Sequence, residues 1–558
     1  MTLAAADVVK LVQSVDWVAI APPTITALAA LLVLVADLFV PQRRKHLLGW
    51  AAAGALALAL LSLLPLLGDD RGTFCRRSAA DSCSYTADQF TLVVQVLVLG
   101  GALIAVLLSV TLLADDAHGT TGDTGTRTLP DGEYWFLLLC SAAGAALLPA
   151  ARDLTTLVVA LEVASLPAFA LVGLKFGDRM SAEAALKFFL SSVTATAVTL
   201  MGVSFVYAAT GSMYLTEIAD ALTEVDGQFA TLARVGVVLT LVGFAFKTAA
   251  VPFHFWVPDT YVGAPLPVTA YLSVIGKAVG FTGLVLVTVL AFPAHADVWG
   301  PALAVLAALT MTVGNAAALR QSATRARGAV RLLAWSSVGQ AGYLLVPIAA
   351  AAYPAGGADA TAHAERAVGS TLAYALMYAV VNLGAFAVVA LVARTRPSNR
   401  LDDYRGLYAE RPLTALALAF LLLCLAGLPP GIVGLFAKVT VFSSAVEAGL
   451  GWLAVVMAVN VVIALSYYLR WTALLFRRPE EAPAPAASVT PPAPPAAAPA
   501  PGAAVTATTT VTTAPTSVPP VAAVPVPLAV AIVLTTALGV VLSVAPQLVL
   551  RFADTVLF

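Results

Sequence analysis

The chain has 558 residues, of which 60% are hydrophobic and 11% are charged, and its formal net charge is −1 at pH 7. A mean hydropathy of +0.92 excludes an ordinary soluble domain and is typical of polytopic membrane proteins. The near-neutral charge also argues against a nucleic-acid binder, which would carry a basic face. We therefore expect an all-α helical bundle in a lipid bilayer.

The sequence offers few side chains for a redox or metal centre, because it contains only four cysteines and five histidines. Cys140 and Cys424 lie in apolar segments, whereas Cys75 and Cys83 share a short loop. No group of these residues has the spacing of a metal site. We expect neither a cofactor nor a metal on this chain.

The first apolar segment, residues 17–40, is long enough to cross a bilayer and lacks the pattern of a cleavable signal peptide. We expect it to be retained as a helix. At roughly 20 apolar residues per span, the sequence predicts about fourteen spans. They lie near residues 17–40, 47–67, 89–113, 133–150, 154–174, 181–208, 231–256, 262–292, 298–319, 328–352, 367–393, 412–446, 450–476 and 527–550.

Lysine and arginine gather in alternate loops, which predicts the orientation in a bacterial cell membrane. Basic residues are concentrated near 43–45, 320–331 and 394–411, and we assign these loops to the inner side. Both termini are then predicted on the outer side. Cys75 and Cys83 would also lie outside, where a disulfide persists. Their spacing leaves a disulfide and two free thiols as equal alternatives.

Residues 477–526 consist largely of Pro, Ala and Thr and predict a disordered or polyproline-like linker on the inner side. Residues 161–172 resemble residues 335–346, and Val251-Pro252 resembles Leu428-Pro429-Pro430. Both offsets are about 175 residues, as in transporters built from two copies of one unit with a broken helix in each. The predicted divisions are 1–130, a first repeat 131–295, a second repeat 296–476, the linker, and a last helix within 527–558.

Four lysines fall inside apolar segments: Lys187, Lys247, Lys277 and Lys438. A charge at the bilayer centre costs at least about 2.5–3.5 kcal/mol, so such residues are expected to face a hydrated interior. At about 1.5 Å of rise per residue, Lys247 and Lys277 lie near the midplane. Lys187 is close enough to the inner end of its helix to reach the surface. For each lysine, the alternative to proton transfer is a structural ion pair or an anchor.

Glu162 is the acidic residue predicted at mid-depth in the first half of the chain. Pairing it with a lysine would contribute roughly 4 kcal/mol at an effective dielectric constant of about 20. A Glu–Lys pair that opens and closes would therefore act as a proton switch. His254 either relays protons or caps backbone carbonyls. Pro252, Pro429 and Pro430 are predicted to break helices and to free carbonyls beside a cavity.

Four segments, residues 161–173, 183–189, 246–259 and 427–438, together resemble the proton-translocating antiporter-like subunits of respiratory complex I. The similarity is closest to subunit N of bacterial NADH–quinone oxidoreductase and covers about residues 85–476. It implies fourteen helices with two inverted five-helix repeats, each containing a discontinuous helix. It also implies a subunit of a proton-translocating NADH:quinone oxidoreductase that performs no redox chemistry itself. Flavin, iron–sulfur clusters and quinone would belong to partner subunits, and the neighbours would be other membrane-arm subunits.

By this resemblance, Glu162 and Lys247 correspond to the family's glutamate–lysine pair. Lys277 corresponds to the central connecting lysine, Lys438 to the terminal lysine, and Lys187 to a further lysine on the sixth helix. Gln340 departs from the histidine of many relatives, so no proton relay is assigned to it. Two alternatives remain at this point: a subunit of a multi-subunit cation/proton antiporter, which shares these motifs, and a non-pumping structural scaffold.

Overall fold

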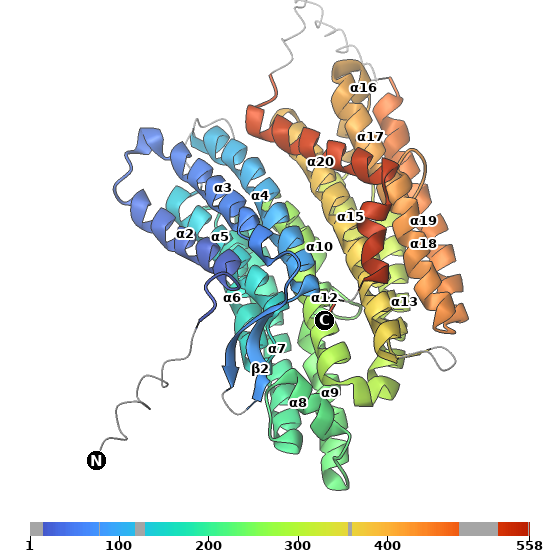
Figure 1. Cartoon of the computed structure of the whole chain (residues 1–558). Helices are drawn as coiled ribbons and strands as arrows, with labels where there is room; N and C mark the ends of the chain where they lie inside the picture. The colour runs from blue at the N-terminus through green and yellow to red at the C-terminus, as the bar shows by residue number, and fades with distance from the viewer. Residues whose placement is uncertain (1–14, 77–78, 118–128, 355–359, 479–522, 556) are drawn as a thin grey trace, which may run out of the picture.

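The structure is a computed structural model that describes residues 15–76, 79–117, 129–354, 360–478, 523–555 and 557–558. Residues 479–522, which hold most of the predicted linker, lie outside this part of the chain. The described chain forms a helical bundle in which the N-terminal helices occupy one side and the C-terminal helices the other (Figure 1).

The first half of the bundle contains a β-hairpin and helices of very different lengths. These elements are α2 (Ala21–Asp37), α3 (His46–Leu61), β1 (Arg71–Arg76), β2 (Ala79–Ala87), α4 (Gln89–Ala117), α5 (Asp131–Leu147), α6 (Leu154–Gly173), α7 (Arg179–Thr210), α8 (Leu215–Leu222), α9 (Gln228–Thr248), α10 (Trp256–Gly263), α11 (Leu266–Tyr271) and α12 (Lys277–Val285).

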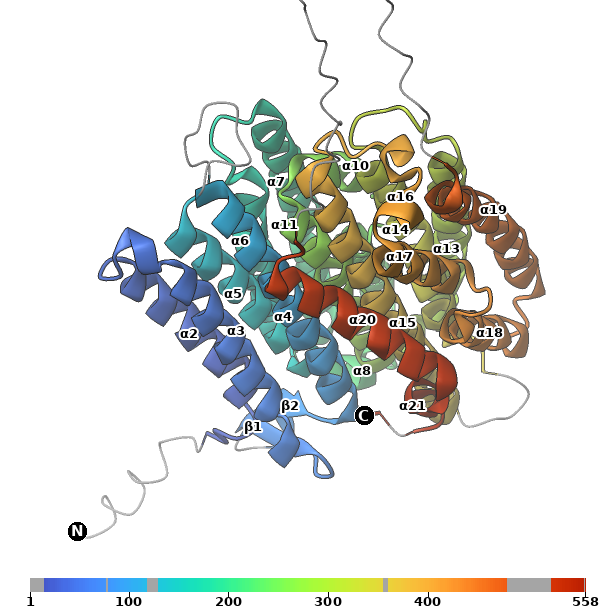
Figure 2. The ribbon, with the colours of Figure 1, turned by 90° about the horizontal axis from the view of Figure 1, so that it is seen from above.

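In the second half every described element of regular secondary structure is a helix, and α20 lies obliquely across α15 in both views (Figures 1 and 2). Its helices are α13 (Ala296–Leu319), α14 (Gly328–Ala350), α15 (Ala360–Thr395), α16 (Leu407–Glu410), α17 (Pro412–Ala426), α18 (Ile432–Glu447), α19 (Gly451–Phe476), α20 (Val526–Val544) and α21 (Gln547–Leu550).

Twelve helical segments in the described residues are long and apolar enough to cross a membrane, and α2 and α17 are shorter apolar helices. The expected polytopic and mostly helical class is therefore confirmed, and the hairpin of β1 and β2 is an addition to the all-α prediction. The predicted span 262–292 is not a uniform α-helix, because π-helical turns at Leu272–Gly276 and Leu286–Ala291 flank α12. π-Helical turns are rare in proteins, and those that occur are often found at functional sites.

Two helices end within the bundle and resume after a short irregular segment. α9 ends at Thr248 and α10 begins at Trp256, with Pro252 between them. α17 ends at Ala426 and α18 begins at Ile432, with Pro429 and Pro430 between them. A prolyl residue has no backbone N–H and cannot continue the helical ladder, so each segment leaves helical carbonyls for other donors.

Close packing of α13 against α14 depends on a small residue at the contact. A Cβ added to Gly314 would lie only 2.3 Å from the backbone nitrogen of Gly339. Glycine therefore lets the two helix backbones approach, which is a common device in membrane bundles. The contact lies on α14, a helix deep inside the bundle: within its most apolar stretch of 18 residues, 94% is buried.

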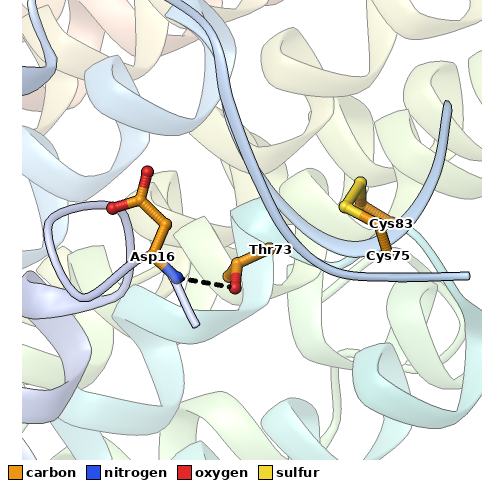
Figure 3. Close-up of a disulfide and its surroundings, with 4 residues drawn as sticks. All are labelled: Asp16, Thr73, Cys75 and Cys83. Atoms are coloured by element: carbon orange, nitrogen blue, oxygen red, sulfur yellow. Dashed lines mark hydrogen bonds between the residues drawn. A yellow bond between two sulfur atoms is a disulfide. The ribbon is translucent and has the colours of Figure 1, made fainter. Parts of the chain in front are cut away.

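The β-hairpin lies at the same end of the molecule as α8 (Figure 1). β1 and β2 pair in antiparallel register, with Cys75 opposite Cys83. The two cysteines form a disulfide (Figure 3), which decides between the two alternatives that the sequence left open. The backbone nitrogen of Asp16 donates to Thr73 Oγ1 at 3.1 Å and ties the segment before α2 to the hairpin.

Candidate functional site

Three of the four predicted lysines are buried in the bundle. The exposed fractions are 5% for Lys247, 1% for Lys277 and 6% for Lys438. Burial of an ammonium group is costly unless polar atoms surround it. The partners of each Nζ atom therefore define the site.

Lys247 lies in the last turn of α9, immediately before the interruption that contains Pro252. Its Nζ donates to Ser192 Oγ of α7 at 2.8 Å. The ring centroids of Phe169, Phe188 and Phe246 lie 4.9, 5.4 and 5.7 Å from the same Nζ. The negative end of the α9 dipole and the three ring faces both favour a cation at this position.

Glu162 of α6 accepts a hydrogen bond from Thr196 Oγ1 at 2.7 Å. Ser192 and Thr196 are one turn apart on α7, so adjacent hydroxyl groups hold Lys247 and Glu162. The expected direct ion pair between Glu162 and Lys247 is absent from the described contacts. The side chains of Glu162 and Lys247 therefore both contact the same face of α7 but do not contact each other.

A small cavity of about 20 Å³ lies beside Lys247 and is lined in part by Ser141, Ser165 and Tyr271. This volume is enough for about one water molecule. The hydroxyl of Tyr271 donates to Ser141 Oγ at 2.9 Å. Because the π-helical turn before Lys277 also lines the cavity, the cavity lies between Lys247 and the segment that carries Lys277.

Lys277 follows that π-helical turn directly and points toward α14. Its Nζ donates to Ser337 Oγ at 2.5 Å, and Ser337 Oγ lies 2.7 Å from the hydroxyl of Tyr378 on α15. The hydroxyl of Tyr261 lies 3.5 Å from Ser337 Oγ, and the Tyr261 ring centroid is 5.8 Å from Lys277 Nζ. The Lys277 ammonium therefore donates to a serine hydroxyl that two tyrosine hydroxyls also contact, and each of these groups can donate and accept.

Lys438 of α18 uses backbone atoms freed by the second helix interruption. Its Nζ donates to the carbonyl oxygens of Leu425 and Ala426, at 2.8 Å each. These are the last carbonyls of α17, where the helix has no partners of its own and its dipole is negative. The ring centroid of Tyr343 lies 5.6 Å from the same Nζ.

Gln340 connects the surroundings of Lys438 to other helices, although the sequence assigned it no role. Its Nε2 donates to the hydroxyl of Tyr468 at 3.1 Å and to Leu425 O at 3.5 Å. The hydroxyl of Tyr374 donates to Gln340 Oε1. Gln340 thus shares a carbonyl acceptor with Lys438 and contacts a tyrosine of α15.

Lys187 does not join the buried lysines, and its side chain reaches the surface, as its place near the end of its helix allowed. Its side chain is 50% exposed and pairs with Glu183 at 2.8 Å and with Asp259 at 3.0 Å. Glu183 lies one turn earlier on α7, and Asp259 lies on α10. Carboxylates near the helix end hold the ammonium there, as in the ion-pair alternative.

His254 lies in the interruption after α9, and its ring centroid is 5.6 Å from that of Trp335. Its Nδ1 is buried and has no hydrogen-bond partner within the described part of the chain. The relay and capping roles of His254 both stay predictions.

Sequence reasoning missed the hydroxyl partners of two lysines, Ser192 and Ser337, and the hydroxyl of Tyr378 that bonds to Ser337. Their signal is weak, because serine and tyrosine are common in helices of every kind. Their regular spacing gives a better signal: Ser192 and Thr196 are four residues apart, as are Tyr374 and Tyr378. Hydroxyl residues repeated at this interval lie on one face of a helix.

Residues 151–464 match the family model described as NADH:quinone oxidoreductase/Mrp antiporter, TM. The chain is 69% identical over 557 residues to NADH-quinone oxidoreductase subunit N 2 of Streptomyces griseus, covering 100% of this chain and 96% of that protein. It is 45% identical to NADH-quinone oxidoreductase subunit N of Salinispora tropica, covering 85% and 88% of the two chains.

Two solved structures have the same arrangement of helices. A chain of respiratory complex I from Thermus thermophilus is 30% identical, with a TM-score of 0.68 and coverage of 95% of this chain and 98% of that chain. A chain of the Mrp complex from Dietzia sp. DQ12-45-1b is 22% identical, with a TM-score of 0.75 and 96% coverage of both, and supports the fold alone. The sequence-based recognition is confirmed: the chain belongs to the subunit N family of NADH-quinone oxidoreductase, the multi-pass antiporter-like subunits of the complex I membrane arm.

Proposed function

We propose that this chain moves protons outward across the membrane through Glu162, Lys247, Lys277 and Lys438. Quinone reduction elsewhere in the complex would drive the transfer. The observation that carries the proposal is that three buried lysines are all held by hydroxyl or carbonyl oxygens. An ammonium with no carboxylate in contact can lose its proton without leaving a buried carboxylate unpaired.

The proposal includes an order of transfer. Glu162 and Lys247 form the first station, separated in this structure by the hydroxyls of Ser192 and Thr196. Rotation of either side chain toward the other would form the ion pair and hold the proton on Lys247. Opening the pair would release the proton toward Lys277, and then toward Lys438. In this scheme Lys187 stabilises the start of α7 and does not transfer protons.

We also propose that the bundle comprises fourteen spans with two inverted repeats, 131–295 and 296–476. The two interruptions support this division, since each lies in one of the segments and contains proline. Each interruption also places helix-terminal carbonyls near a buried lysine. The excess of lysine and arginine in alternate loops supports both termini outside.

A subunit of a cation/proton antiporter is the second candidate, favoured by the similarity in fold to a chain of the Mrp complex. The two functions predict different partners. If the first is correct, the chain will co-purify with membrane-arm subunits and with proteins that carry flavin, iron–sulfur clusters and bound quinone. Isolation with transporter subunits that lack these groups would favour the antiporter.

The substitution Lys247→Arg tests proton transfer directly, because arginine keeps the charge but does not deprotonate in proteins. We expect complex I to assemble and the number of protons pumped per NADH oxidised to fall several-fold. The measurement is dye quenching in inverted membrane vesicles, alongside NADH oxidation. Lys45→Arg is the matched control, since Lys45 pairs with Asp37 outside the site. Normal pumping by Lys247→Arg would refute the proposed role.

A further inference from the structure

A polar cavity of about 400 Å³ lies between α15, α18 and α21, apart from the buried lysines. The side chains that line it include those of His363, Arg366, Ser370, Ser444 and Glu447. This volume holds several water molecules, and the lining offers them donors and acceptors. The cavity is therefore suited to water.

One helix connects this cavity with the centre of the bundle. Arg366, Ser370, Tyr374, Tyr378 and Asn382 follow each other at intervals of four residues along α15. Side chains at this interval form a line that turns slowly around the helix. The last four are at most 4% exposed, so the line is a buried polar stripe.

In the centre of the bundle, Tyr374 and Tyr378 of the α15 stripe reach the partners of the buried lysines. The hydroxyl of Tyr378 lies 2.7 Å from Ser337 Oγ, which accepts from Lys277. One turn away, Tyr374 donates to Gln340 Oε1, and Gln340 donates to the same Leu425 carbonyl that accepts from Lys438. The stripe thus contacts the partners of two buried lysines.

The other end of the stripe, at Arg366 and Ser370, lines the cavity. Ser444 Oγ of α18 donates to Ser370 Oγ at 3.0 Å, and both residues line the cavity. Along α15, Ser370 is one turn before Tyr374, a backbone rise of about 6 Å, and the Ser370 hydroxyl also donates to the Arg366 carbonyl at 3.0 Å. Lys438 is six residues before Ser444 on α18, a rise of about 9 Å.

The charged groups of the cavity suit proton release. Glu447 accepts from Ser443 Oγ at 2.6 Å, and its carboxylate can take up a proton and return it to bulk water. Arg366 remains charged at every physiological pH. Its positive charge at the cavity opposes the return of protons to the stripe.

We propose that this cavity is the outer mouth of the proton path, that Ser370 and Tyr374 carry the proton to it, and that Glu447 receives it there. The inference rests on the proposed function. In chemical terms, a proton leaves the Lys438 ammonium for water or a hydroxyl oxygen. Each hydroxyl accepts one proton and gives up another, so no net charge stays on the stripe.

The first test measures access to the cavity with assembled complex I in membrane vesicles. Ser443→Cys places a thiol in the cavity, and Val446→Cys on the same helix is the matched control, since Val446 does not line the cavity and is 52% exposed. Both variants also carry Cys140→Ala, which removes a partly exposed free thiol and so lowers background labelling. We expect a charged, impermeant methanethiosulfonate to label Ser443→Cys from the outer side only. Labelling should lower protons pumped per NADH several-fold, with no such change for Val446→Cys. Labelling from the inner side only, or none, would overturn the proposal.

The second test removes the hydroxyl with little change in shape. Ser370→Val should reduce protons pumped per NADH several-fold, and Ser370→Thr, which restores a hydroxyl, should recover most of the loss. Lys247→Arg separates this inference from the proposed function. If Lys247→Arg abolishes pumping while Ser370→Val pumps normally, the exit is wrong and the function stands. If Lys247→Arg itself pumps normally, the proposed function fails.

Discussion

The buried lysines are held by neutral oxygen atoms. Lys247 and Lys277 each donate to a serine hydroxyl, and Lys438 donates to two helix-terminal carbonyls. Such partners reduce the cost of burial without a carboxylate that would hold the charge permanently. Lys187, which contacts two carboxylates, differs in this respect and is also exposed. The choice of partner therefore separates candidate proton carriers from a structural ion pair.

The first residue-scale prediction concerns Ser337, whose hydroxyl lies between Lys277 and Tyr378. A hydrogen bond to a charged group contributes about 1.5–3 kcal/mol, so Ser337→Ala should weaken proton binding at Lys277 by about ten- to a hundredfold. We expect slower proton pumping at unchanged complex assembly, measured in inverted vesicles. Thr288→Val is the control, because the Thr288 hydroxyl bonds only to carbonyls of its own helical segment. Equal pumping by the two variants would contradict the prediction.

At the scale of the elements, interrupted helices supply what the buried charges need. Lys247 lies at the end of α9, and Lys438 donates to the end of α17. In both cases a helix C-terminus, which carries partial negative charge, lies within the bundle. Neighbouring helices must then be held closely enough to keep these ends in place.

The contact between α13 and α14 gives the second prediction. Gly314→Ala would place a Cβ 2.3 Å from the Gly339 nitrogen, so the helices must move apart. Overpacking of this kind costs about 1–3 kcal/mol. We expect less assembled complex and a lower Tm in detergent. Gly54→Ala is the control, because a Cβ there meets no atom within 4 Å. Equal melting of both variants would contradict the close-packing explanation.

The third prediction concerns the contact between the β-hairpin and the segment that contains α8. Glu217 accepts from Ser212 Oγ at 2.5 Å and from Arg76 Nη1 at 2.8 Å. The Ser212 hydroxyl, and after it the Arg76 charge, lower the pKa of Glu217 below its ordinary value. A lowered folded-state pKa means that stabilisation is present above the unfolded-state pKa and is lost as pH falls through the folded-state value.

Glu217→Gln should therefore lower the Tm at pH 7, and the difference from the unmodified chain should shrink as the pH falls below about 4. Because the pair is partly exposed, the effect should be at most about 1 kcal/mol. Thermal melting from pH 7 down to about pH 3 measures it. A difference that grows toward acid pH would have the wrong sign for this contact.

At the scale of the whole molecule, buried polar contacts run from one half of the bundle to the other. Lys277 lies at the junction, since it belongs to the first half and donates to α14 in the second. α14 also carries Gln340, which contacts α19 through Tyr468. A polar path from one half of the bundle to the other therefore depends on how the two halves pack.

The fourth prediction concerns the orientation of the bundle. Excess lysine and arginine mark the inner side, so the loop after α13 should face inward and the acidic loop after α8 outward. Thr223→Cys and Ser322→Cys place exposed thiols in these loops. An impermeant thiol reagent should label Thr223→Cys in right-side-out vesicles and Ser322→Cys in inverted ones. The reverse pattern would show the opposite orientation.

The membrane class, the family and the residues that are expensive to bury can all be read from the amino-acid sequence. Charges in long apolar segments stand out locally, as Lys247 and Lys277 do, because their cost depends on hydropathy along the chain. Pro252 and Pro429 are also visible, since proline removes a donor from the helical ladder, although α6, α13 and α14 continue through Pro167, Pro301 and Pro347. These signals need no knowledge of distant residues.

The partners of those residues become visible when the helices are packed together. Ser192 is 55 residues from Lys247, and Ser337 is 60 residues from Lys277, so hydropathy along the chain does not connect them. The place of Lys187 near a helix end is visible in the sequence, but its partner Asp259 is 72 residues away along the chain. The physical reason is that the energy of a buried charge depends on the atoms within a few ångströms, and helix packing brings those atoms together.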